Sequence, residues 1–466
     1  MSSGNDAPPD RWLAALLSSL APGAGHIYAG HDERGRRLLA IDVVLIAMAV
    51  VAVVFFRGEV LKAWASLSSL SLIMVANLIV LSYRAWAAHD AFHLASGRIL
   101  STRVVAILFA SVVWLVVLVP HVALGYLNVV QHSLISEVFV ASGDLISPET
   151  TLPVAVDDDS GAPGATTTTV AEPALWDGLE RLNVLLLGSD VGEGRRGIRT
   201  DTMIVVSIDP ASGDTAMVSL PRNFSGIDLP PGFGNWDCQC FPQLLNDLYY
   251  YAEENPEAFP GPGEPGPRTI KATIGHLLGL EIHYYAMVGL EGFVGIVDAL
   301  GGVEIDVPNR IVDETYPHED GVTTEHVVIE EGPQTLDGHL ALAYARIRRH
   351  ADDFARMNRQ RCVLGAVIEQ SSPLELLGRY ASIAQVLKDH LETDIPQDRL
   401  VDFIDLLPRV SLARVGILHV DRDYISGTDP GHTYYDEERI RAETQTLLAD
   451  PTAYASEGLI LDSTCD

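Results

Sequence analysis

The sequence predicts an α/β domain, with a mixed central sheet flanked by helices, that is preceded by an all-helical transmembrane region. Long apolar stretches concentrate before residue 130, a polar segment follows, and strand-like and helix-like segments alternate beyond Leu182. Alternation of this kind implies a mixed sheet covered by helices. With 466 residues the chain is too long for one ordinary domain, and about two or three units are expected.

The region 1–130 is predicted to lie in the membrane with about three helices. Stretches 38–56, 65–83 and 104–126 have the length and apolar character of transmembrane helices. An earlier apolar piece, 12–30, is interrupted by Pro22 and Gly23. Because the part before the proline is too short to cross a bilayer, we interpret 12–30 as an interfacial or re-entrant piece. Its segment Pro22–Gly30 resembles the glycine-rich hairpin of TM2-like membrane domains.

Basic residues near these stretches predict which way they point. They precede the first span and fill the second inter-span loop, and none follows Arg103 until Arg181: Arg11, Arg34, Arg36, Arg37, Arg84, Arg98 and Arg103. The positive-inside rule then places the N-terminus in the cytoplasm and everything after residue 130 outside. The expected location is therefore the cell membrane, with several passes and an extracellular catalytic domain.

Residues 131–180 are expected to form a flexible extracellular stalk. Within them lie three consecutive aspartates from Asp157 and a run of four threonines from Thr166. Such a composition cannot bury a core. We expect the soluble domain to cover 181–420, and 421–466 to add a C-terminal helix and tail that complete it.

The elements of this domain follow in order along the chain. Strands are predicted over 183–188, 202–208, 216–220, 303–307 and 414–420, and helices over 270–278, 292–299, 354–370 and 436–448. The segment 339–347 is predicted to run from a helical piece into a strand that carries Arg346. On such a strand Arg346 and Arg348 would share a face.

The charge balance argues against nucleic acid as a partner. Acidic residues outnumber basic ones by 62 to 31, for a formal net charge of −31, whereas phosphate contacts need Lys and Arg. Simple solubility is the alternative interpretation of this acidity. Only three of the basic residues are lysines, and arginine clusters are suited to binding phosphate groups.

Two aspartates are candidate metal ligands. Asp190 ends the first predicted strand and Asp201 begins the next, so the two carboxylates meet at one end of the sheet if these strands pair. Carboxylates, phosphate oxygens and waters are the usual ligands of Mg²⁺. Alternatively, Asp190 caps a turn and Asp201 is a solvated loop residue.

Arginines form the stronger signal. Six fall between residues 346 and 361, and on a helix Arg356 and Arg359 would share a face. Arg199 and Arg222 lie near strand ends. Several guanidinium groups in one cleft need an anion of high charge, such as a pyrophosphate, to offset their repulsion. The alternative is that Asp352 and Asp353 pair with these arginines on a solvated surface.

An ordered set of short motifs resembles the LytR-CpsA-Psr family. The motifs span about residues 181 to 370: Asn183–Asp190, Arg199–Met203, Ser219–Arg222, Gly289–Phe293, Ile296–Val303, Leu336–Arg348 and Asp353–Gln360. Each motif is weak alone, but their common order is specific to the family. The resemblance implies an α/β/α domain that transfers a glycopolymer from a polyprenyl-pyrophosphate carrier to peptidoglycan by a phosphodiester link.

The resemblance also assigns roles to individual residues. Asp190 and Asp201 match the family's aspartates that bind Mg²⁺ (or Mn²⁺), and Gln360 matches its substrate-binding glutamine. The matching pyrophosphate-binding arginines are Arg199, Arg222, Arg346, Arg348, Arg356 and Arg359. A long hydrophobic pocket for the lipid is implied, with Ile274, Leu277, Phe293 and Val297 as candidate lining residues, although core packing is the alternative for each.

Asn223 and the extra spans, three where typical family members have one, keep a second function open. Asn223 stands where the family usually has Asp, and Leu244 stands where it commonly has Lys. The alternative function is a non-catalytic protein that binds polyprenyl pyrophosphate or serves as a scaffold of the envelope.

The four cysteines are predicted to lie outside, where disulfides are permitted. They are Cys238, Cys240, Cys362 and Cys465. A bond between Cys238 and Cys240 would close a small ring, so we slightly favour one of these two pairing with Cys362 or Cys465. The sequence leaves all three complete pairings open.

Overall fold

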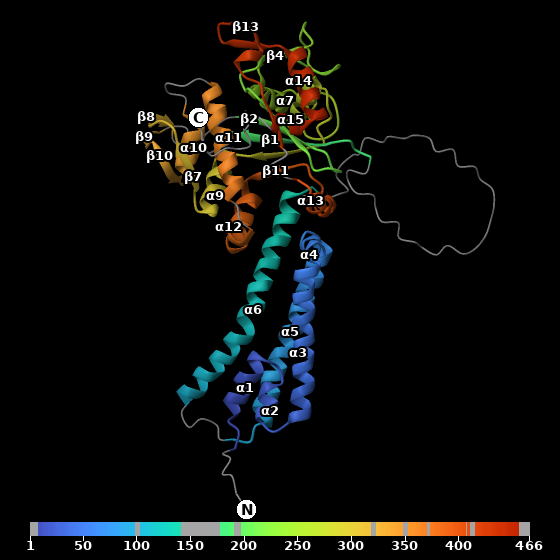
Figure 1. Ribbon diagram of the computed structural model, residues 1–466, viewed down its shortest axis with the longest axis vertical. Helices are drawn as coiled ribbons and strands as arrows, with labels where there is room; N and C mark the ends of the chain where they lie inside the picture. The colour runs from blue at the N-terminus through green and yellow to red at the C-terminus, as the bar shows by residue number, and fades with distance from the viewer. Residues whose placement is uncertain are drawn as a thin grey trace, which may run out of the picture. The chain divides into compact units, whose positions relative to one another are not determined.

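The computed structural model describes residues 8–97, 103–140, 178–190, 197–317, 323–347, 353–370, 373–406, 408–410 and 415–455. The chain forms two compact units, Met1–Ile135 and Ser136–Asp466 (Figure 1). Most of the predicted stalk, residues 141–177, lies outside the described residues, as does Arg348.

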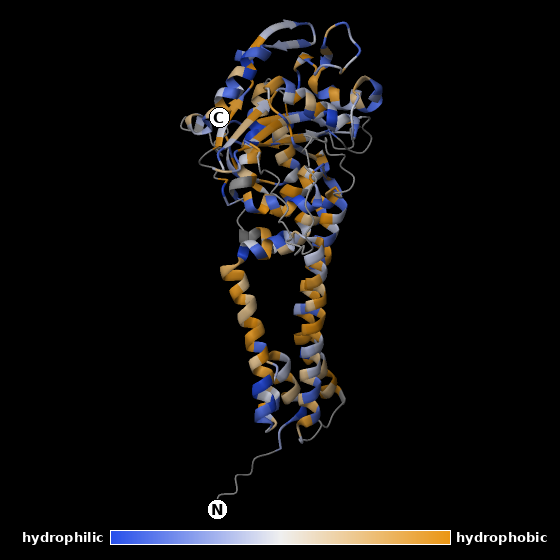
Figure 2. Ribbon diagram, turned by 90° about the vertical axis from the view of Figure 1, so that its right-hand side faces the viewer, coloured by the Kyte–Doolittle hydropathy of each residue, from blue (hydrophilic) through white to orange (hydrophobic). Residues whose placement is uncertain are grey.

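The first unit is helical. Its helices are α1 (Arg11–Leu20), α2 (Ala24–Tyr28), α3 (Asp32–Phe55), α4 (Arg57–Trp64), α5 (Leu67–Leu94) and α6 (Arg103–Val138), of which α6 ends in the second unit. Three of them are long and apolar enough to cross a membrane: Asp32–Phe55, Leu67–Leu94 and Val104–Val138. Hydrophobic residues dominate along these helices in Figure 2. The three predicted spans thus coincide with three helices that could cross a membrane, which indicates a membrane protein.

The piece 12–30 forms the two short helices α1 and α2. Asp10 caps α1 by accepting hydrogen bonds from the backbone N–H groups of Trp12 and Leu13. With 10 residues, α1 is about 15 Å long, half the thickness of a hydrocarbon core. Between the helices Gly23 has a φ of 101°, and a Cβ there would lie 2.2 Å from the carbonyl oxygen of Gly35. Only glycine fits this turn.

Charged side chains inside this unit are paired, as burial in an apolar environment requires. Asp42 of α3 accepts a hydrogen bond from Arg84 of α5 at 3.4 Å. Asp90 lies 2.7 Å from the ring of the fully buried His26 and 2.8 Å from Arg34. These pairs join α2, α3 and α5.

The second unit is built on one mixed, six-stranded sheet, which confirms the predicted fold class. The strand order is β11-β6-β1-β2-β3-β12. The bounds are β1 (Leu182–Ser189), β2 (Thr200–Ile208), β3 (Thr215–Leu220), β6 (Tyr284–Val288), β11 (Leu391–Thr393) and β12 (Val415–His419). β2 is antiparallel to both of its neighbours, β1 and β3, whereas β6 is parallel to β1 and β12 is parallel to β3.

Alternate residues of each strand face different cores. Leu185 and Leu187 of β1 pack with α7 (Leu248–Glu254), α8 (Pro265–Leu278) and α14 (Glu437–Ala449) on one side of the sheet. Leu186, between them, joins Ile204 and Leu364 of α11 (Asp353–Gln370) in a different cluster. The sheet therefore lies between two helical layers, as an α/β/α domain requires (Figure 1).

A second core forms around α9 (Leu290–Leu300), α10 (Gly338–Arg346) and α11. Two small sheets complete it, β7 (Val303–Val307) with β10 (Gly332–Leu336) and β8 (Ile311–Pro317) with β9 (Thr324–Ile329). The remaining elements are β4 (Ser225–Asp228), β5 (Cys240–Leu244), α12 (Pro373–His390), α13 (Leu400–Leu406), β13 (Ile425–Asp429), β14 (His432–Tyr435) and α15 (Pro451–Ala455).

Most predicted elements are present within a few residues of their expected bounds. The segment 339–347 is the exception, because α10 is helical from Gly338 to Arg346 and no strand carries Arg346 there. Strand β6, in the interior of the sheet, was not predicted. Its five residues, Tyr284–Val288, are too few to show a clear period.

The helix that leads out of the first unit is longer than predicted. It continues to Val138, and the backbone N–H of Val140 donates to Ile395 at 3.2 Å. The carbonyl of Val140 accepts from Gln397 at 2.9 Å. Residues 136–140 therefore pack with the α/β unit, and the first part of the expected stalk is ordered helix.

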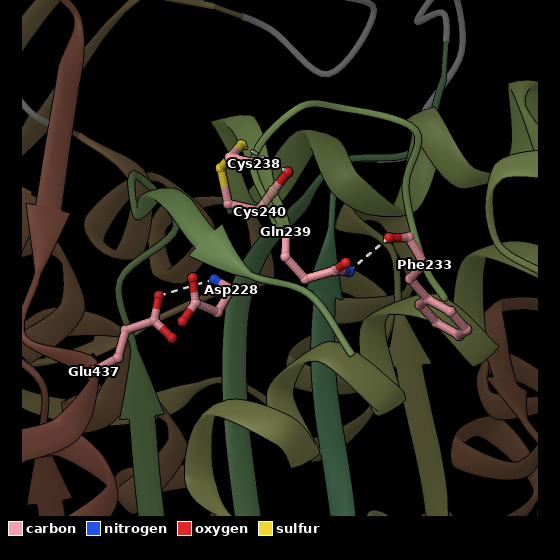
Figure 3. The surroundings of a disulfide bond; sticks show 6 residues. All are labelled: Asp228, Phe233, Cys238, Gln239, Cys240 and Glu437. Carbon is pink, nitrogen blue, oxygen red and sulfur yellow. Dashed lines mark hydrogen bonds between the residues drawn. A yellow bond between two sulfur atoms is a disulfide. The ribbon is translucent and has the colours of Figure 1, made fainter. Parts of the chain in front are cut away.

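The structure bonds Cys238 to Cys240, and the pairing that the sequence analysis favoured is wrong (Figure 3). Their Cα atoms are 5.1 Å apart, within the range that a disulfide spans. The turn before β5 brings them together: Leu229 donates to the Gln239 carbonyl at 2.9 Å, and the Gln239 side chain donates to Phe233 at 2.9 Å. Cys465 lies outside the described residues.

Candidate active site

The polar site begins where β1 ends and β2 starts. A β-bulge at Gly188 and Ser189 interrupts the pairing of these strands. Beyond it, the backbone N–H of Asp190 donates to the carbonyl of Arg199 at 3.0 Å, and the Arg199 N–H donates to Asp190 Oδ1 at 2.9 Å. The two strands pair, so Asp190 and Asp201 lie at the same end of the sheet, as predicted.

Asp201 is held by two side chains that both contact Oδ1. Arg222, which follows β3, donates from Nη1 at 2.7 Å, and Asn246 donates from Nδ2 at 3.0 Å. Burial alone would raise the pKa of Asp201. The charge and hydrogen bond of Arg222, with the Asn246 bond and the charge of Arg356, outweigh it and hold that pKa below its ordinary value. Asp201 is therefore an anion in the folded protein.

One cavity of about 710 Å³ adjoins this cluster. Its polar wall includes four of the predicted site residues besides Asp201: Arg222, Arg346, Arg356 and Gln360. Its apolar wall comes from the sheet and from α9, α10 and α11. The apolar members are Leu186, Leu187, Ile204, Val288, Leu290, Phe293, Ile296, Val297, Leu342, Ala345, Ile347, Leu364 and Val367.

Helix α11 explains how one element contributes to both walls. Arg356, Gln360, Leu364 and Val367 all line the cavity, and their spacing of three and four residues places them on one helix face. Arg356 is only 3% exposed, and its Nη1 lies 3.3 Å from the backbone carbonyl of Asp201.

Arg346 lines the cavity from the last turn of α10 rather than from a strand. Its Nη1 donates to the hydroxyl of Tyr316 at 3.2 Å, and its guanidinium lies 5.7 Å from the centre of that ring. Tyr316, on β8, is 2% exposed. This packing restricts the Arg346 side chain before any ligand binds.

Three predicted residues do not line the cavity. Arg359 donates from Nε to the Tyr344 carbonyl at 2.7 Å and from Nη2 to the Ile347 carbonyl, which supports the end of α10. Arg199 donates to Asp247 at 2.6 Å and is half-exposed. Asp190 bonds to the Arg199 backbone. Arg359 therefore differs from the neighbouring Arg356, which does line the cavity.

Of the four candidate lipid-contacting residues, two line the cavity and two do not. Phe293 and Val297 of α9 line the cavity. Ile274 and Leu277 of α8 do not: both are fully buried in the core on the other side of the sheet. The core-packing alternative is thus correct for these two.

Sequence reasoning missed several polar groups at the site. Asp313 and Tyr316 of β8 line the cavity, and Asp313 is 8% exposed. Asn246 and Asp247 follow β5 and contact Asp201 and Arg199. Asn246 lies two residues after Leu244, whose departure from the family pattern was the only feature of this segment that the sequence indicated.

Two other features of the sequence lie beside the cavity without lining it. Asn223, where the family usually has Asp, accepts a hydrogen bond from the Tyr435 hydroxyl at 3.1 Å, which either residue type would allow. Arg361 donates to Nε2 of His419. Burial, with the charge of Arg361, lowers the pKa of His419 to about 3, so this histidine is neutral.

Among the described residues, no group of three or more His, Cys, Asp or Glu side chains is placed to hold a metal ion. The two predicted aspartates provide only carboxylate oxygens, and both hydrogen bonds to the Asp201 carboxylate go to Oδ1. Hard oxygen donors of this kind suit Mg²⁺ when phosphate oxygens and waters complete its shell. The donor set therefore fits a cation that binds together with an anionic substrate.

Comparison with known proteins places the second unit in a family. The LytR_cpsA_psr family matches residues 158–448, more than half of the chain. The polyisoprenyl-teichoic acid–peptidoglycan teichoic acid transferase TagU of Oceanobacillus iheyensis is 29% identical over 276 residues, which cover 58% of this chain and 77% of TagU. TagU of Bacillus mycoides is 30% identical over 226 residues, which cover 48% of this chain and 63% of that relative.

In the crystal structure of Bacillus subtilis TagV, the crystallised chain is 23% identical to this chain. The match covers 58% of this chain and 98% of the crystallised chain, with a TM-score of 0.42. The matched residues include all the ordered motifs of the α/β unit. The chain belongs to the LytR_cpsA_psr family.

Proposed function

We propose that this protein transfers a glycopolymer from a polyprenyl-pyrophosphate carrier to peptidoglycan, with formation of a phosphodiester link. A single observation carries the proposal. One cavity of about 710 Å³ combines a continuous apolar wall with the guanidinium groups of Arg222, Arg346 and Arg356. A lipid tail with a pyrophosphate head matches both surfaces at once. The relatives are named as transferases that join a polyisoprenyl-linked teichoic acid to peptidoglycan.

The reaction makes one P–O bond and breaks one. A sugar hydroxyl of peptidoglycan attacks the phosphorus that bears the glycan, and the bond from this phosphorus to the bridging oxygen breaks. The products are the glycan–phosphate–peptidoglycan diester and polyprenyl phosphate, and the hydroxyl proton passes to a base or to solvent. Negative charge builds on the bridging and non-bridging oxygens during this exchange.

The arginines are suited to stabilise that charge. Arg356 is buried and Arg346 is fixed against Tyr316, so little reorganisation is needed when charge develops. Arg222 donates to Asp201, which fixes its guanidinium group, and it lines the cavity. Gln360 lies one helical turn after Arg356 and adds a neutral donor to the same wall.

Asp190 and Asp201 would hold Mg²⁺ (or Mn²⁺) together with oxygens of the pyrophosphate. The cation would supply charge neutralisation for the leaving phosphate. Asp201 remains ionised because of its contacts with Arg222 and Asn246, and an ionised carboxylate is the form that binds a metal ion.

The positive-inside pattern supports an extracellular position for the α/β unit, where peptidoglycan is found. Arginines accompany the cytoplasmic ends of the spans, and α6 carries none between Arg103 and its end at Val138. Testing this requires a labelling reagent that does not cross membranes, applied to intact cells with single cysteines placed at Glu59 and at Arg310.

The transfer assay uses the full chain in detergent micelles, a short synthetic prenyl-pyrophosphate glycan and peptidoglycan oligomers. Mass spectrometry follows the diester with Mg²⁺, with EDTA and with Arg346→Ala. Arg310→Ala is the matched control, because Arg310 is half-exposed and pairs with Glu330 away from the cavity. A diester that needs both the metal and Arg346 supports the proposal. The carrier-binding alternative would be supported if the protein bound the carrier but formed no diester, while an active relative formed the diester in the same assay.

A further inference from the structure

The side-chain amide of Asn246 has one hydrogen-bonded end and one end without a partner among the described residues. Asn246 is 6% exposed, and Nδ2 donates to Asp201 Oδ1 at 3.0 Å. Its Oδ1 atom is buried and has no hydrogen-bond partner among the residues that the structure describes. Buried polar atoms of this kind are rare and call for an explanation such as an ordered water or an ion.

The orientation of this amide follows from its neighbour. Asp201 Oδ1 also accepts a hydrogen bond from Arg222 Nη1 at 2.7 Å, so this oxygen is an acceptor. The amide group that faces it must be the NH₂ end, because the other end of Asn246 can only accept. A flipped amide would place two acceptor oxygens against each other, so Oδ1 is the end of the amide that does not contact Asp201 Oδ1.

Two backbone hydrogen bonds fix the main chain at Asn246. The backbone N–H of Asn246 donates to the Arg222 carbonyl at 3.1 Å. The backbone N–H of Leu245 donates to the Phe224 carbonyl at 2.7 Å. Asn246 is therefore attached to the segment after β3 that also carries Arg222. A buried, pre-oriented amide oxygen beside a carboxylate is a pattern that hard cations use as a ligand set.

We infer that Oδ1 of Asn246 is a third oxygen donor for the divalent cation, directly or through a bound water, beside the carboxylates of Asp190 and Asp201. This inference rests on the metal ion of the proposed function. It explains why a neutral residue occupies this position: a third carboxylate would repel Asp201 whenever the cation is absent. The amide supplies an oxygen on one side and a donor to Asp201 on the other.

Asn183 provides a matched control within the same chain. It is 5% exposed, its Nδ2 donates to the Glu281 carbonyl at 2.6 Å, and its Oδ1 is buried without a partner among the described residues. However, it lies at the opposite end of β1 from Ser189, about 20 Å along the strand. Replacing either asparagine by leucine removes the same groups, but only one of them lies near Asp201.

The test is Mn²⁺ binding to the full chain in detergent micelles, followed by electron paramagnetic resonance, which distinguishes free from bound Mn²⁺. Titrations use Mn²⁺ alone and Mn²⁺ with a short prenyl pyrophosphate. Asn246→Leu is expected to raise the Kd by about tenfold or more, the usual effect of losing a group that supports a metal site. Asn183→Leu is expected to leave the Kd unchanged, and Asn246→Asp to bind at least as tightly as the wild type.

The Asp variant separates an oxygen donor from a positioning role. If only the N–H donor to Asp201 mattered, Asn246→Asp would bind Mn²⁺ as weakly as Asn246→Leu, and this result would overturn the inference. So would equal Kd values for Asn246→Leu and the wild type, or no Mn²⁺ binding by the wild type in either titration. Where thermal unfolding shows that Asn246→Leu has not folded, the Asp variant alone decides.

The results that would contradict the proposed function differ from those that would contradict this inference. Diester formation that persists in EDTA, or none at all in the transfer assay, contradicts the metal-dependent transferase. In either case, a Kd for Mn²⁺ that changes in the Asn246 variants but not in Asn183→Leu would still establish the metal site. Conversely, metal-dependent transfer with an unaltered Kd in Asn246→Leu removes only the third donor.

Discussion

Arg222 donates a hydrogen bond from Nη1 to Oδ1 of Asp201 over 2.7 Å, and this contact joins the end of β3 to the start of β2. The carboxylate orients the guanidinium towards the cavity, and the guanidinium keeps the carboxylate ionised. Neither side chain is fully buried, so a ligand can approach both.

Replacing Arg222 by alanine is expected to lower the rate of transfer by about 10²- to 10³-fold, the usual cost of losing one preorganised donor to developing charge. Arg222→Lys is expected to recover only part of this loss, because lysine keeps the charge but lacks the planar fork. Initial rates of diester formation measure both. A lysine variant with the wild-type rate would contradict the role of the fork.

Arg359 is expected to affect stability more than Arg346 does. Arg359→Ala removes the donor for the carbonyls of Tyr344 and Ile347, and each unsatisfied buried carbonyl costs about 1–3 kcal/mol. Thermal unfolding of the two alanine variants in parallel compares them. The expected order is a lower Tm for Arg359→Ala and a near wild-type Tm for Arg346→Ala. The opposite order would mean that Arg359 does not support α10.

Filling the apolar wall is expected to weaken carrier binding. Ile296 lines the cavity from α9, and tryptophan at this position would occupy space that the lipid needs. Ile296→Trp is expected to raise KM for the prenyl-pyrophosphate substrate by about tenfold, which corresponds to about 1.4 kcal/mol of lost binding. Glu291→Trp on the exposed face of α9 is the control. Equal KM values for the two variants would place the lipid elsewhere.

Stability is expected to fall between pH 4.5 and 7 because of Glu437. Burial raises the pKa of this residue to about 7 from an ordinary 4.5, although its Oε1 accepts a hydrogen bond from the backbone N–H of Asp228 (Figure 3). The folded protein binds the proton more tightly than the unfolded chain does. The contribution of Glu437 to the free energy of unfolding is therefore complete below pH 4.5 and is lost as the pH rises through 7. The loss is at most about 3 kcal/mol.

Glu437→Gln keeps the acceptor but cannot ionise. We expect it to raise Tm at pH 8 and to leave Tm unchanged at pH 4.5, as measured by thermal unfolding of both proteins across this range. A constant difference in Tm at all pH values would contradict titration of Glu437 as the cause.

Local sequence patterns were sufficient to predict much of the structure of this protein. A stretch of apolar residues long enough to span a bilayer is a local property, and the three spans follow from it. Strand Leu182–Ser189 contains the continuous apolar run Val184–Leu187 because both faces of the strand are covered. The pairing of β1 with β2 then brought Asp190 and Asp201 to one end of the sheet.

Other features were decided only by the tertiary structure. Arg356 and Arg359 are three residues apart on one helix, yet only Arg356 reaches the cavity, because the carbonyls that end α10 take the donors of Arg359. Ile274 and Phe293 are both apolar residues of helices, but those helices pack in different cores.

The site itself also depends on contacts between distant residues. Asn246 meets Asp201 from 45 positions away, and Tyr316 meets Arg346 from 30 positions away. No sequence period encodes such pairs, because the loops between them determine which side chains arrive together. The sequence by itself determined the three long apolar helices, strands β1, β2, β3, β7 and β12, and the charge of the site. Only the packed chain decided which of those charges share one cavity with the apolar wall.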